Sequence, residues 1–444
     1  MGIQFYLFTA YIFILTSAIS FFMIPLLIRL AKKFDIIDYP NHRKIHTTPT
    51  PLLGGIAIWG AFTIALATHV SLAAFLKDFI TNGTLFSSQL QFYANNTTCI
   101  TNQVFAVLGG GLIIAIVGIV DDIRGLSIWI RLLTETAVAF LMVWMGFKLD
   151  IFLPEITTWI ITILWIVGIT NAFNLLDGAD GLASGVGIIS SLILAGIMFF
   201  GNQPLIALLL LTLAAAIGGF LRYNLPPAKI FMGSAGSMFI GYILSITTIL
   251  ATFTIDNACT NYVIVLPVVI LSMPLYDTFS VIFLRSIKKV SLTKGDMNHL
   301  VHRLMRARYS QRKAVLLIYL MSFIIGISGV FLLWTTVVQS ILLLSFITVL
   351  FVCIFVFEYF LIKQNHKSVK LKNLATMQNK HSDSGKSITS GVDNIIIGLI
   401  VFLLCALPLA IDLHLERPFS LCKLVLFYGM ALFISLHHYC SIIS

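Results

Sequence analysis

The sequence predicts an all-α protein, built as a polytopic bundle of transmembrane helices. Hydrophobic residues make up 59% of its 444 residues and charged residues only 10%, and the mean hydropathy is +0.99, which lies outside the usual composition of soluble globular domains. Long apolar runs recur along the chain, and a helix that crosses a bilayer needs roughly 20 such residues. Because these runs are continuous rather than short and alternating, the sequence excludes a transmembrane β-barrel.

Thirteen apolar runs are candidates for spanning helices. In chain order they lie near 5–28, 52–76, 104–120, 128–147, 153–173, 186–201, 204–221, 235–255, 262–284, 314–335, 339–362, 394–411 and 419–436. The first run is longer than the apolar part of a signal peptide and follows no basic segment, so we expect a retained helix. Eleven core helices and two C-terminal helices are expected. The chain then divides into a main transmembrane bundle (1–335), an eleventh transmembrane helix (336–362), a cytoplasmic basic linker (363–393) and a two-helix membrane tail (394–444).

The basic residues between the runs predict the orientation in the membrane. The net charge is +10, from 28 Lys and Arg against 18 Asp and Glu. With the N-terminus outside, most Lys and Arg residues fall in cytoplasmic loops, as the positive-inside rule requires. The sequence therefore predicts a multi-pass protein of the cell inner (cytoplasmic) membrane with a cytoplasmic C-terminus. The basic residues form no DNA-binding motif, so no nucleic-acid partner is expected.

The six cysteines are too few for a disulfide framework, and their spacing fits no zinc site. Cys99 and Cys259 fall in the expected external loops, where a disulfide and two unpaired thiols are both compatible with the sequence. The other four lie in or beside apolar runs as small hydrophobic residues.

Acidic residues are few, and several gather where apolar runs meet the cytoplasmic boundary. The sharpest string is NAFNLLDGADGLASG, Asn171–Gly185, which is a poor helix former directly after an apolar run. Such a segment predicts an irregular loop that lines a polar cavity. Its carboxylates and amide oxygens suit Mg²⁺ or Mn²⁺, and its glycines let the backbone approach a phosphate. A further acid, Asp277, lies inside the ninth run, where a charge is costly.

Two further strings lie at the same boundary. In GIVDDIRGLS, Gly118–Ser127, the adjacent carboxylates suit proton transfer or metal positioning, and Arg124 is close enough in sequence to pair with one of them. A DD pair at a helix end is weak evidence alone, because helix ends also collect charge. In PPAKIFMGSAGSMFIG, Pro226–Gly241, small residues open a helix whose N–H groups could hold an anion. A close-packed contact between helices is the alternative for that string.

A basic loop, Arg285–Ala314, follows the ninth run. In it His299 and His302 lie three residues apart, on one face if helical, beside Arg303. Arginine and histidine donors suit a pyrophosphate. The alternative, a loop that only orients the protein and contacts anionic lipid, explains the charge but not the histidine spacing. Asn41–Leu53 adds a second basic loop on this side.

Together these strings resemble the polyprenyl-phosphate N-acetylhexosamine-1-phosphate transferase family over roughly residues 20–315. The blocks RKIHTTPTPLLGG, VDDIRG, NAFNLLDGADGLASG, PPAKIFMGSAGS and DMNHLVHRL match those of the family in the same order. The resemblance implies transfer of a sugar 1-phosphate from a UDP-sugar to a membrane polyprenyl phosphate, with release of UMP and a need for Mg²⁺ or Mn²⁺. It makes 1–335 the catalytic bundle, with its site on the cytoplasmic face.

The AKIFMG and DMNHLVHRL segments look closest to the undecaprenyl-phosphate GlcNAc-1-phosphate branch. That branch implies UDP-GlcNAc and undecaprenyl phosphate as substrates, at the lipid bilayer. Its product starts the synthesis of cell-envelope polysaccharides such as lipopolysaccharide or teichoic acid. Whether the chain forms a homodimer is left open.

The resemblance also implies roles for individual residues. Catalytic roles fall to Asp121, Asp122, Asp177 and His299. Substrate contacts fall to Asp180, Asn171, His302, Arg303, Lys44 and His46. The metal ligands would be Asn174, Asp121, Asp122 and Ser234.

Two positions depart from the family pattern. Ser234 stands where the family block GDAGS or GDSGS has a metal-binding aspartate, and a serine hydroxyl is a weaker ligand than a carboxylate. Val301 stands at the third residue of a motif that usually reads HLHH or HIHH. The alternative function is therefore a catalytically impaired homologue that binds polyprenyl phosphate or a UDP-sugar. A phospho-MurNAc-pentapeptide transferase is another alternative, and a secondary transporter a weaker one, because the acids lie at one boundary rather than at the midplane.

Overall fold

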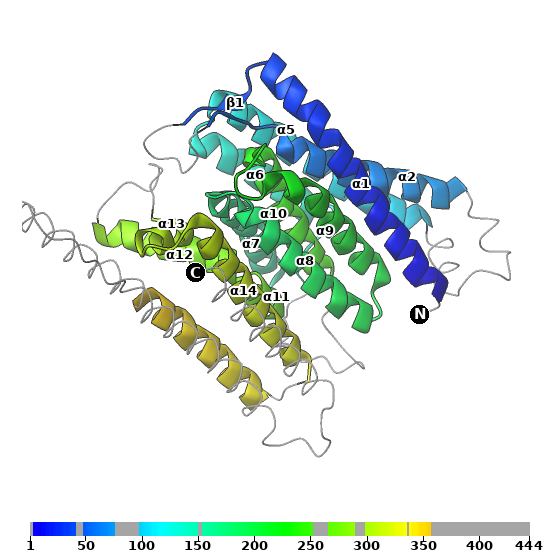
Figure 1. Ribbon diagram of the computed structural model, residues 1–444. Helices are drawn as coiled ribbons and strands as arrows, with labels where there is room; N and C mark the ends of the chain where they lie inside the picture. Colours follow the sequence, from blue (N-terminus) through cyan, green and yellow to red (C-terminus); the bar gives the residue numbers. More distant parts are fainter. Residues whose placement is uncertain are drawn as a thin grey trace, which may run out of the picture. The chain divides into compact units, whose positions relative to one another are not determined.

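The computed structural model describes residues 3–40, 48–75, 97–149, 153–251, 265–288, 298–334 and 337–356, which are almost entirely helical (Figure 1). Within these ranges, nine helices are long and apolar enough to cross a membrane. The predicted all-α, polytopic membrane architecture is confirmed. The predicted linker and tail, 363–444, lie outside the described residues, as does Cys259 with its suggested pairing.

The chain divides into two compact units. The first comprises Met1–Leu333 and Cys353–Ile362, and the second comprises Trp334–Val352 and Lys363–Ser444. Every described site residue discussed below belongs to the first unit. The apolar helix Val337–Val356 corresponds to the predicted run 339–362 and is long enough to span a bilayer.

Helix α10 forms the centre of the first unit. The helices are α1 (Ile3–Lys33), α2 (Gly54–Phe75), α5 (Thr97–Arg124), α6 (Ile128–Trp144), α7 (Glu155–Leu176), α8 (Leu182–Phe200), α9 (Pro204–Asn224), α10 (Gly233–Leu250), α11 (Leu266–Ile270), α12 (Ser272–Lys288), α13 (Leu300–Arg306) and α14 (Gln311–Val330). In α10, 89% of the apolar span is buried, and the helix packs against α2, α5, α7 and α9 (Figure 1). Outer helices turn large apolar side chains outward, as Trp129 of α6 does at 73% exposure. Such a surface suits contact with lipid.

Small residues bring the neighbouring helices close to the start of α10. A Cβ added at Gly55 of α2 would lie 2.2 Å from the backbone nitrogen of Gly236, and one added at Gly118 of α5 would lie 2.4 Å from Ala235 Cα. No side chain fits in either place, so glycine is required for this approach. The close-packed contact offered as an alternative for the Pro226–Gly241 string is therefore present.

The chain that leads into α10 is held by two other segments. Residues Ile37–Asp38 and Thr50–Pro51 form a short antiparallel pair, β1 and β2, before α2. Phe231 N–H donates to the carbonyl of Pro51, and the N–H groups of Gly54 and Gly55 donate to the carbonyls of Phe231 and Met232. The start of α2 and the start of α10 are thereby joined through their backbones.

The predicted single run 262–284 is two helices in the structure. Helix α11 ends at Ile270, and α12 begins at Ser272. Pro267 lies in the first turn of α11 and Pro274 in the first turn of α12, where a missing N–H costs little. Apolar composition alone does not reveal such a break.

Candidate active site

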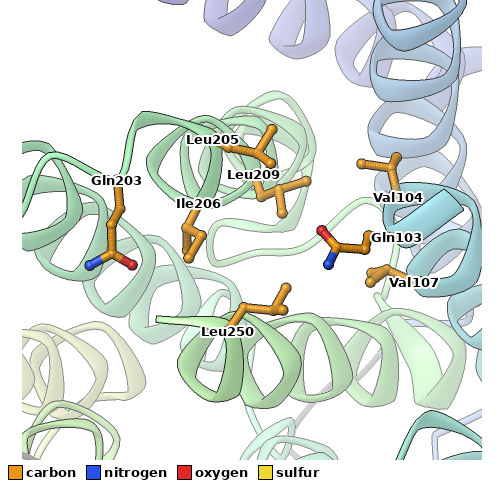
Figure 2. A pocket seen from close by; sticks show the side chains of 8 residues that line it. All are labelled: Gln103, Val104, Val107, Gln203, Leu205, Ile206, Leu209 and Leu250. Carbon is orange, nitrogen blue, oxygen red and sulfur yellow. The ribbon is translucent and has the colours of Figure 1, made fainter. Parts of the chain in front are cut away.

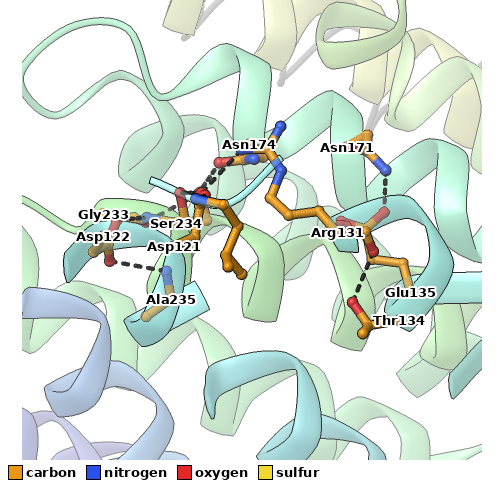
Figure 3. Close-up of polar contacts among 12 residues, drawn as sticks. Asp121, Asp122, Arg131, Thr134, Glu135, Asn171, Asn174, Gly233, Ser234 and Ala235 are labelled. Atoms are coloured by element: carbon orange, nitrogen blue, oxygen red, sulfur yellow. Dashed lines mark hydrogen bonds and ion pairs between the residues drawn. The ribbon is translucent and has the colours of Figure 1, made fainter. Parts of the chain in front are cut away.

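Asp122, near the end of α5, caps the N-terminus of α10 from outside that helix (Figure 3). Its Oδ1 accepts a hydrogen bond from the N–H of Ser234 at 2.7 Å, and its Oδ2 accepts one from the N–H of Ala235 at 3.3 Å. The contact is close, because a Cβ added at Gly233 would meet Asp122 Oδ2 at 2.3 Å, and Gly233 has a φ of +69°. A carboxylate at this position satisfies helix N–H groups and the positive end of the helix dipole. The predicted anion-binding helix start is thus occupied by a side chain of the protein itself.

Asp121 is bound from three directions. Its Oδ2 accepts hydrogen bonds from the hydroxyl of Ser234 at 2.7 Å and from Arg131 Nη1 at 2.9 Å, while its Oδ1 accepts one from the N–H of Leu126 at 2.9 Å. The partner of the acidic pair is therefore Arg131 of α6, whereas Arg124, the expected partner, is exposed at the end of α5. The sequence pointed to Arg124 by nearness along the chain. The turn between α5 and α6 brings Arg131 back instead.

Two asparagines of α7 face the same region (Figure 3). Asn174 Oδ1 accepts a hydrogen bond from the hydroxyl of Ser237 at 3.0 Å, which connects α7 to α10. One turn earlier, the Asn171 amide donates to Glu135 Oε2 of α6 and to the carbonyl of Val167. Glu135 is only 1% exposed, and its other oxygen has no partner among the described residues. Four helices therefore contribute polar side chains to one buried cluster.

The predicted irregular loop, Asn171–Gly185, is shorter in the structure, because α7 continues to Leu176 and α8 begins at Leu182. Only residues 177–181 connect the two helices, so the prediction was wrong for both asparagines, which are helical. Asp177 is the C-cap of α7, and Asp180 Oδ2 accepts a hydrogen bond from the N–H of Ala228 at 3.0 Å. Burial of the Asp177 carboxyl group, together with the negative charges of Asp122 and Asp180, raises its pKa to about 8. Within the described ranges, Asp177 accepts no hydrogen bond that would offset this repulsion.

Asn224, at the end of α9, holds the second half of this loop. Its Oδ1 accepts hydrogen bonds from the N–H of Gly181 and the hydroxyl of Ser184, both at 3.0 Å, and its amide donates to the carbonyl of Ile230. Gly181 has a φ of +76°, a conformation that favours glycine. A single buried side chain thus joins the acidic loop to the segment that leads into α10.

The two histidines lie at the start of α13. His299 Nδ1 is 2.8 Å from Asp277 Oδ2 of α12, and the rings of His299 and His302 are 6.4 Å apart between centroids. His302 adjoins the acidic loop, since a Cβ added at Gly178 would lie 3.8 Å from His302 Nε2. Arg303 is 2% exposed, and it donates to the hydroxyl of Ser280 and lies over the ring of Tyr276. The structure thus places the histidines beside the loop and Arg303 against α12.

The chemistry of these side chains fits a divalent cation. Asp121, Asn174 and Ser234 offer oxygen donors at adjoining positions, and Asp177 supplies a buried carboxylate whose repulsion a cation would offset. In the described ranges no three His, Cys, Asp or Glu side chains gather closely enough to hold a metal. A cation here would therefore depend on neutral oxygens as well as carboxylates.

The structure adds three residues to the predicted site residues, and it does not describe two of the predicted ones. Arg131, Glu135 and Asp277 contact the predicted residues directly. Only Asp277 carried a signal, because an acid within an apolar run is unusual. Lys44 and His46 lie outside the described residues.

A separate cavity lies at the other end of the bundle (Figure 2). It has a volume of about 290 Å³ and is lined by apolar residues of α5, α9 and α10 together with Gln103 and Gln203. Leu250, the last residue of α10, lines it, whereas the acidic cluster lies at the first residues of that helix. This cavity is not part of the acidic cluster.

Several named bacterial proteins have sequences similar to this chain. Residues 104–252 match the model of Glycosyl transferase family 4. A probable undecaprenyl-phosphate N-acetylglucosaminyl 1-phosphate transferase of Bacillus subtilis (strain 168) is 36% identical over 349 residues, which cover 76% of this chain and 88% of that protein. A decaprenyl-phosphate N-acetylglucosaminephosphotransferase of Mycolicibacterium smegmatis is 33% identical, over 66% of this chain and 74% of that protein. An undecaprenyl-phosphate alpha-N-acetylglucosaminyl 1-phosphate transferase of Escherichia coli (strain K12) is 28% identical, over 72% and 81%.

Proposed function

The chain belongs to glycosyl transferase family 4, and we propose that it transfers GlcNAc 1-phosphate from UDP-GlcNAc to undecaprenyl phosphate, releasing UMP. The names of its relatives in three bacteria support a polyprenyl-phosphate acceptor and N-acetylglucosamine as the sugar, since each name combines the two. The product, a lipid-linked diphospho-sugar, would start the synthesis of a cell-envelope polysaccharide.

One observation carries the proposal. Direct hydrogen bonds join α10 to both α5 and α7. The N–H of Ser234 donates to Asp122 and its hydroxyl donates to Asp121, while the hydroxyl of Ser237 donates to Asn174. The cluster lies at helix ends rather than at mid-span. At a helix end a water-soluble nucleotide and a lipid phosphate could both reach it. Phosphoryl transfer depends mainly on placing such groups in line and neutralising their charge.

The reaction requires one bond to form and one to break. An oxygen of the lipid phosphate attacks the phosphorus that carries the sugar, and the bond from this phosphorus to the oxygen of UMP breaks. In our proposal Asp121 and Asp122 handle the lipid phosphate, while Asp177 acts from the acidic loop and His299 and His302 serve the diphosphate. Asp180 and Asn171 would contact the nucleotide sugar. Arg303, which packs against α12 beside the histidines, would add a positive charge near the substrate.

We propose Mg²⁺ or Mn²⁺ as the cofactor. Asn174, Ser234, Asp121 and Asp122 would hold the ion, which would neutralise charge on the diphosphate when bound. Asp122 and Asp121 also keep α10 and Arg131 in place through hydrogen bonds. These two acids therefore have a structural role besides any role toward a metal.

The proposed location is the inner (cytoplasmic) membrane, with the site facing the cytoplasm. Basic residues border this end of the bundle, as Lys32 and Lys33 do in the last turn of α1. UDP-sugars are cytoplasmic metabolites, so a donor site on this face would be supplied directly. The bilayer would supply the lipid acceptor.

The test is release of UMP from labelled UDP-GlcNAc by the full-length protein with undecaprenyl phosphate and Mg²⁺. We expect Asp122→Asn and Asp177→Asn each to lower turnover by about 10² or more, the scale of losing one charged catalytic group. Asp35→Asn is the matched control, because Asp35 is exposed and its carboxylate binds only Tyr39 among the described residues. Near-normal rates in both site variants would show that the site is misplaced.

A catalytically impaired homologue remains the second candidate, and a specific contact favours it. Ser234 replaces the family aspartate, and its hydroxyl binds Asp121, which also pairs with Arg131. Arg131 thus balances the negative charge of Asp121 without a metal. A chain that binds UDP-GlcNAc but releases no UMP would support this candidate, whereas release from UDP-MurNAc-pentapeptide alone would identify the peptidoglycan-precursor branch.

A further inference from the structure

Asp277 is a buried carboxylate inside the polar face that α12 presents to α13. It is 1% exposed, and both of its oxygens are used. Oδ2 lies 2.8 Å from His299 Nδ1, and Oδ1 accepts a hydrogen bond from the N–H of Leu300 at 2.6 Å. A carboxylate buried in an apolar segment is costly unless such contacts compensate for the lost hydration. Both of its contacts go to the first two residues of the histidine motif.

The contact with Asp277 fixes how the His299 ring is presented. A histidine whose Nδ1–H donates to a carboxylate is held in one ring orientation, and the carboxylate favours the doubly protonated ring, whose Nε2–H is left to donate to a second partner. Within the described residues, Nε2 of His299 has no hydrogen-bond partner, and the side chain keeps 12% of its exposure. The carboxylate of Asp277 therefore fixes the ring through Nδ1, and no described residue binds the other ring nitrogen.

The held ring lies next to the acidic loop. His302 is adjacent to His299, at 6.4 Å between ring centroids, and it in turn adjoins Gly178, which lies between Asp177 and Asp180. A diphosphate bound over this loop would lie near the side of α13 that carries both histidines. The position of Nε2 thus depends on a residue that was not among the predicted site residues.

Asp277 is not the only link between α12 and α13. Arg303 donates to the hydroxyl of Ser280 at 2.7 Å and lies over the Tyr276 ring, with 5.8 Å from its guanidinium carbon to the ring centroid. These contacts join the same two helices through the residue directly before Asp277 and through a residue three positions after it. The helix pair therefore has other anchors if the carboxylate of Asp277 is removed.

We infer that Asp277 is a positioning residue, which orients the doubly protonated ring of His299 so that its Nε2–H donates a hydrogen bond to the diphosphate of the sugar donor. The inference rests on the proposed function, because it needs a diphosphate substrate. Asp277 itself touches no substrate. It acts by holding His299, so its effect must disappear when His299 is absent.

The test compares kcat and KM for UDP-GlcNAc in four variants of the full-length protein. Asp277→Asn can still accept from Leu300 N–H but loses the carboxylate at His299, and we expect kcat to fall about 10- to 100-fold with KM within about threefold. In a His299→Ala background, adding Asp277→Asn should cause no further loss, because residues that act as one unit are not additive. Thr278→Val is the matched control. It changes the neighbouring side chain on α12, whose hydroxyl donates to the carbonyl of Pro274 and to no other described residue.

The possible results separate the inference from the proposed function. If Asp277→Asn accumulates poorly in membranes, Asp277→Glu keeps the charge but displaces it by one methylene, and should lower kcat by about tenfold without raising KM. Unchanged kcat in the Asp277 variants, or equal losses with and without His299, would overturn the positioning role while leaving the proposed function intact. A wild-type protein that releases no UMP from any UDP-sugar would overturn both.

Discussion

Ser234 is the residue through which α10 contacts both members of the acidic pair. Its N–H donates to Asp122 and its hydroxyl donates to Asp121. A serine here avoids placing a third carboxylate beside two others, and it offers a neutral oxygen to a cation. Compared with an aspartate, the serine therefore lowers the repulsion among the carboxylates, and it is a weaker ligand for a cation.

The first prediction at this scale concerns the metal requirement. Ser234→Asp should lower the Mg²⁺ concentration for half-maximal UMP release, on the order of tenfold, because an added carboxylate binds a hard cation more strongly than a hydroxyl does. Ser234→Asn has nearly the shape of aspartate without its charge, and it should not lower the midpoint. A Mg²⁺ titration of the wild type and both variants measures this.

Two other outcomes of that titration are informative. An unchanged midpoint with an unchanged rate would mean that position 234 does not face the metal. Loss of all activity in Ser234→Asp, with normal activity in Ser234→Asn, would mean that the added charge repels the donor diphosphate.

The site residues that could be predicted from the sequence lie in short segments whose local composition already indicates a chemical role. Asn174, Asp177 and Asp180 belong to one string, Asn171–Gly185, whose composition predicted oxygen ligands. In the structure Asn174 lies near the end of α7, and the two aspartates lie in the loop that follows it. The contacts of Arg131 with Asp121 and of Asp277 with His299 were not predicted, because these partners lie 10 and 22 residues apart across helix ends. Which helical turn faces a neighbour depends on the geometry of the connecting segments, which the periodicity of either helix alone does not determine.

At the scale of elements, the start of α10 is the part that organises the cluster. It is fixed by Asp122, by the backbone bonds from the start of α2, and by close approaches at Gly55 and Gly118. Because these contacts all converge on 231–236, a small shift of α10 would move Ser234 away from both aspartates at once. Packed helices transmit such shifts with little relaxation.

A pair of substitutions in one helix tests this dependence. Gly118→Ala would place a Cβ 2.4 Å from Ala235 Cα, so α10 or α5 must move, and overpacking of this kind costs about 1–3 kcal/mol of stability. We expect a lower thermal midpoint and at least tenfold lower turnover, on the scale of misplaced catalytic groups. Gly109→Ala in the same helix meets nothing within 4 Å and should change neither quantity. Equal behaviour of the two variants in thermal unfolding and UMP release would contradict this account.

Helices were predictable as elements, whereas their breaks and ends were less so. The apolar run 204–221 corresponds to α9 and the run 153–173 to α7, since hydrophobicity and length suffice for such spans. The break at Leu271 between α11 and α12 was missed, because both helices are apolar and only the positions of two prolines hint at it. The β1–β2 pair was missed as well, since pairs of two residues carry no periodicity.

For the molecule as a whole, the first unit has two chemically different ends. The acids of α5, the acidic loop and the first turn of α10 lie at one end, and the cavity at Gln103, Gln203 and Leu250 lies at the other. A transferase that uses a nucleotide sugar needs its polar end on the side where that sugar is made. The basic residues near this end predict the cytoplasmic side.

Cysteine labelling of intact cells tests this orientation at both ends. Ser127 follows α5 at the acidic end, Asn202 lies between α8 and α9 at the opposite end, and both are exposed. With the N-terminus outside, Asn202→Cys should react with a membrane-impermeant maleimide in intact cells, while Ser127→Cys should react only after the membrane is permeabilised. Mass analysis of the two labelled peptides separates them from the six native cysteines. The reversed pattern would place the acidic cluster outside the cell, away from cytoplasmic UDP-GlcNAc, and would contradict the proposed function together with the topology.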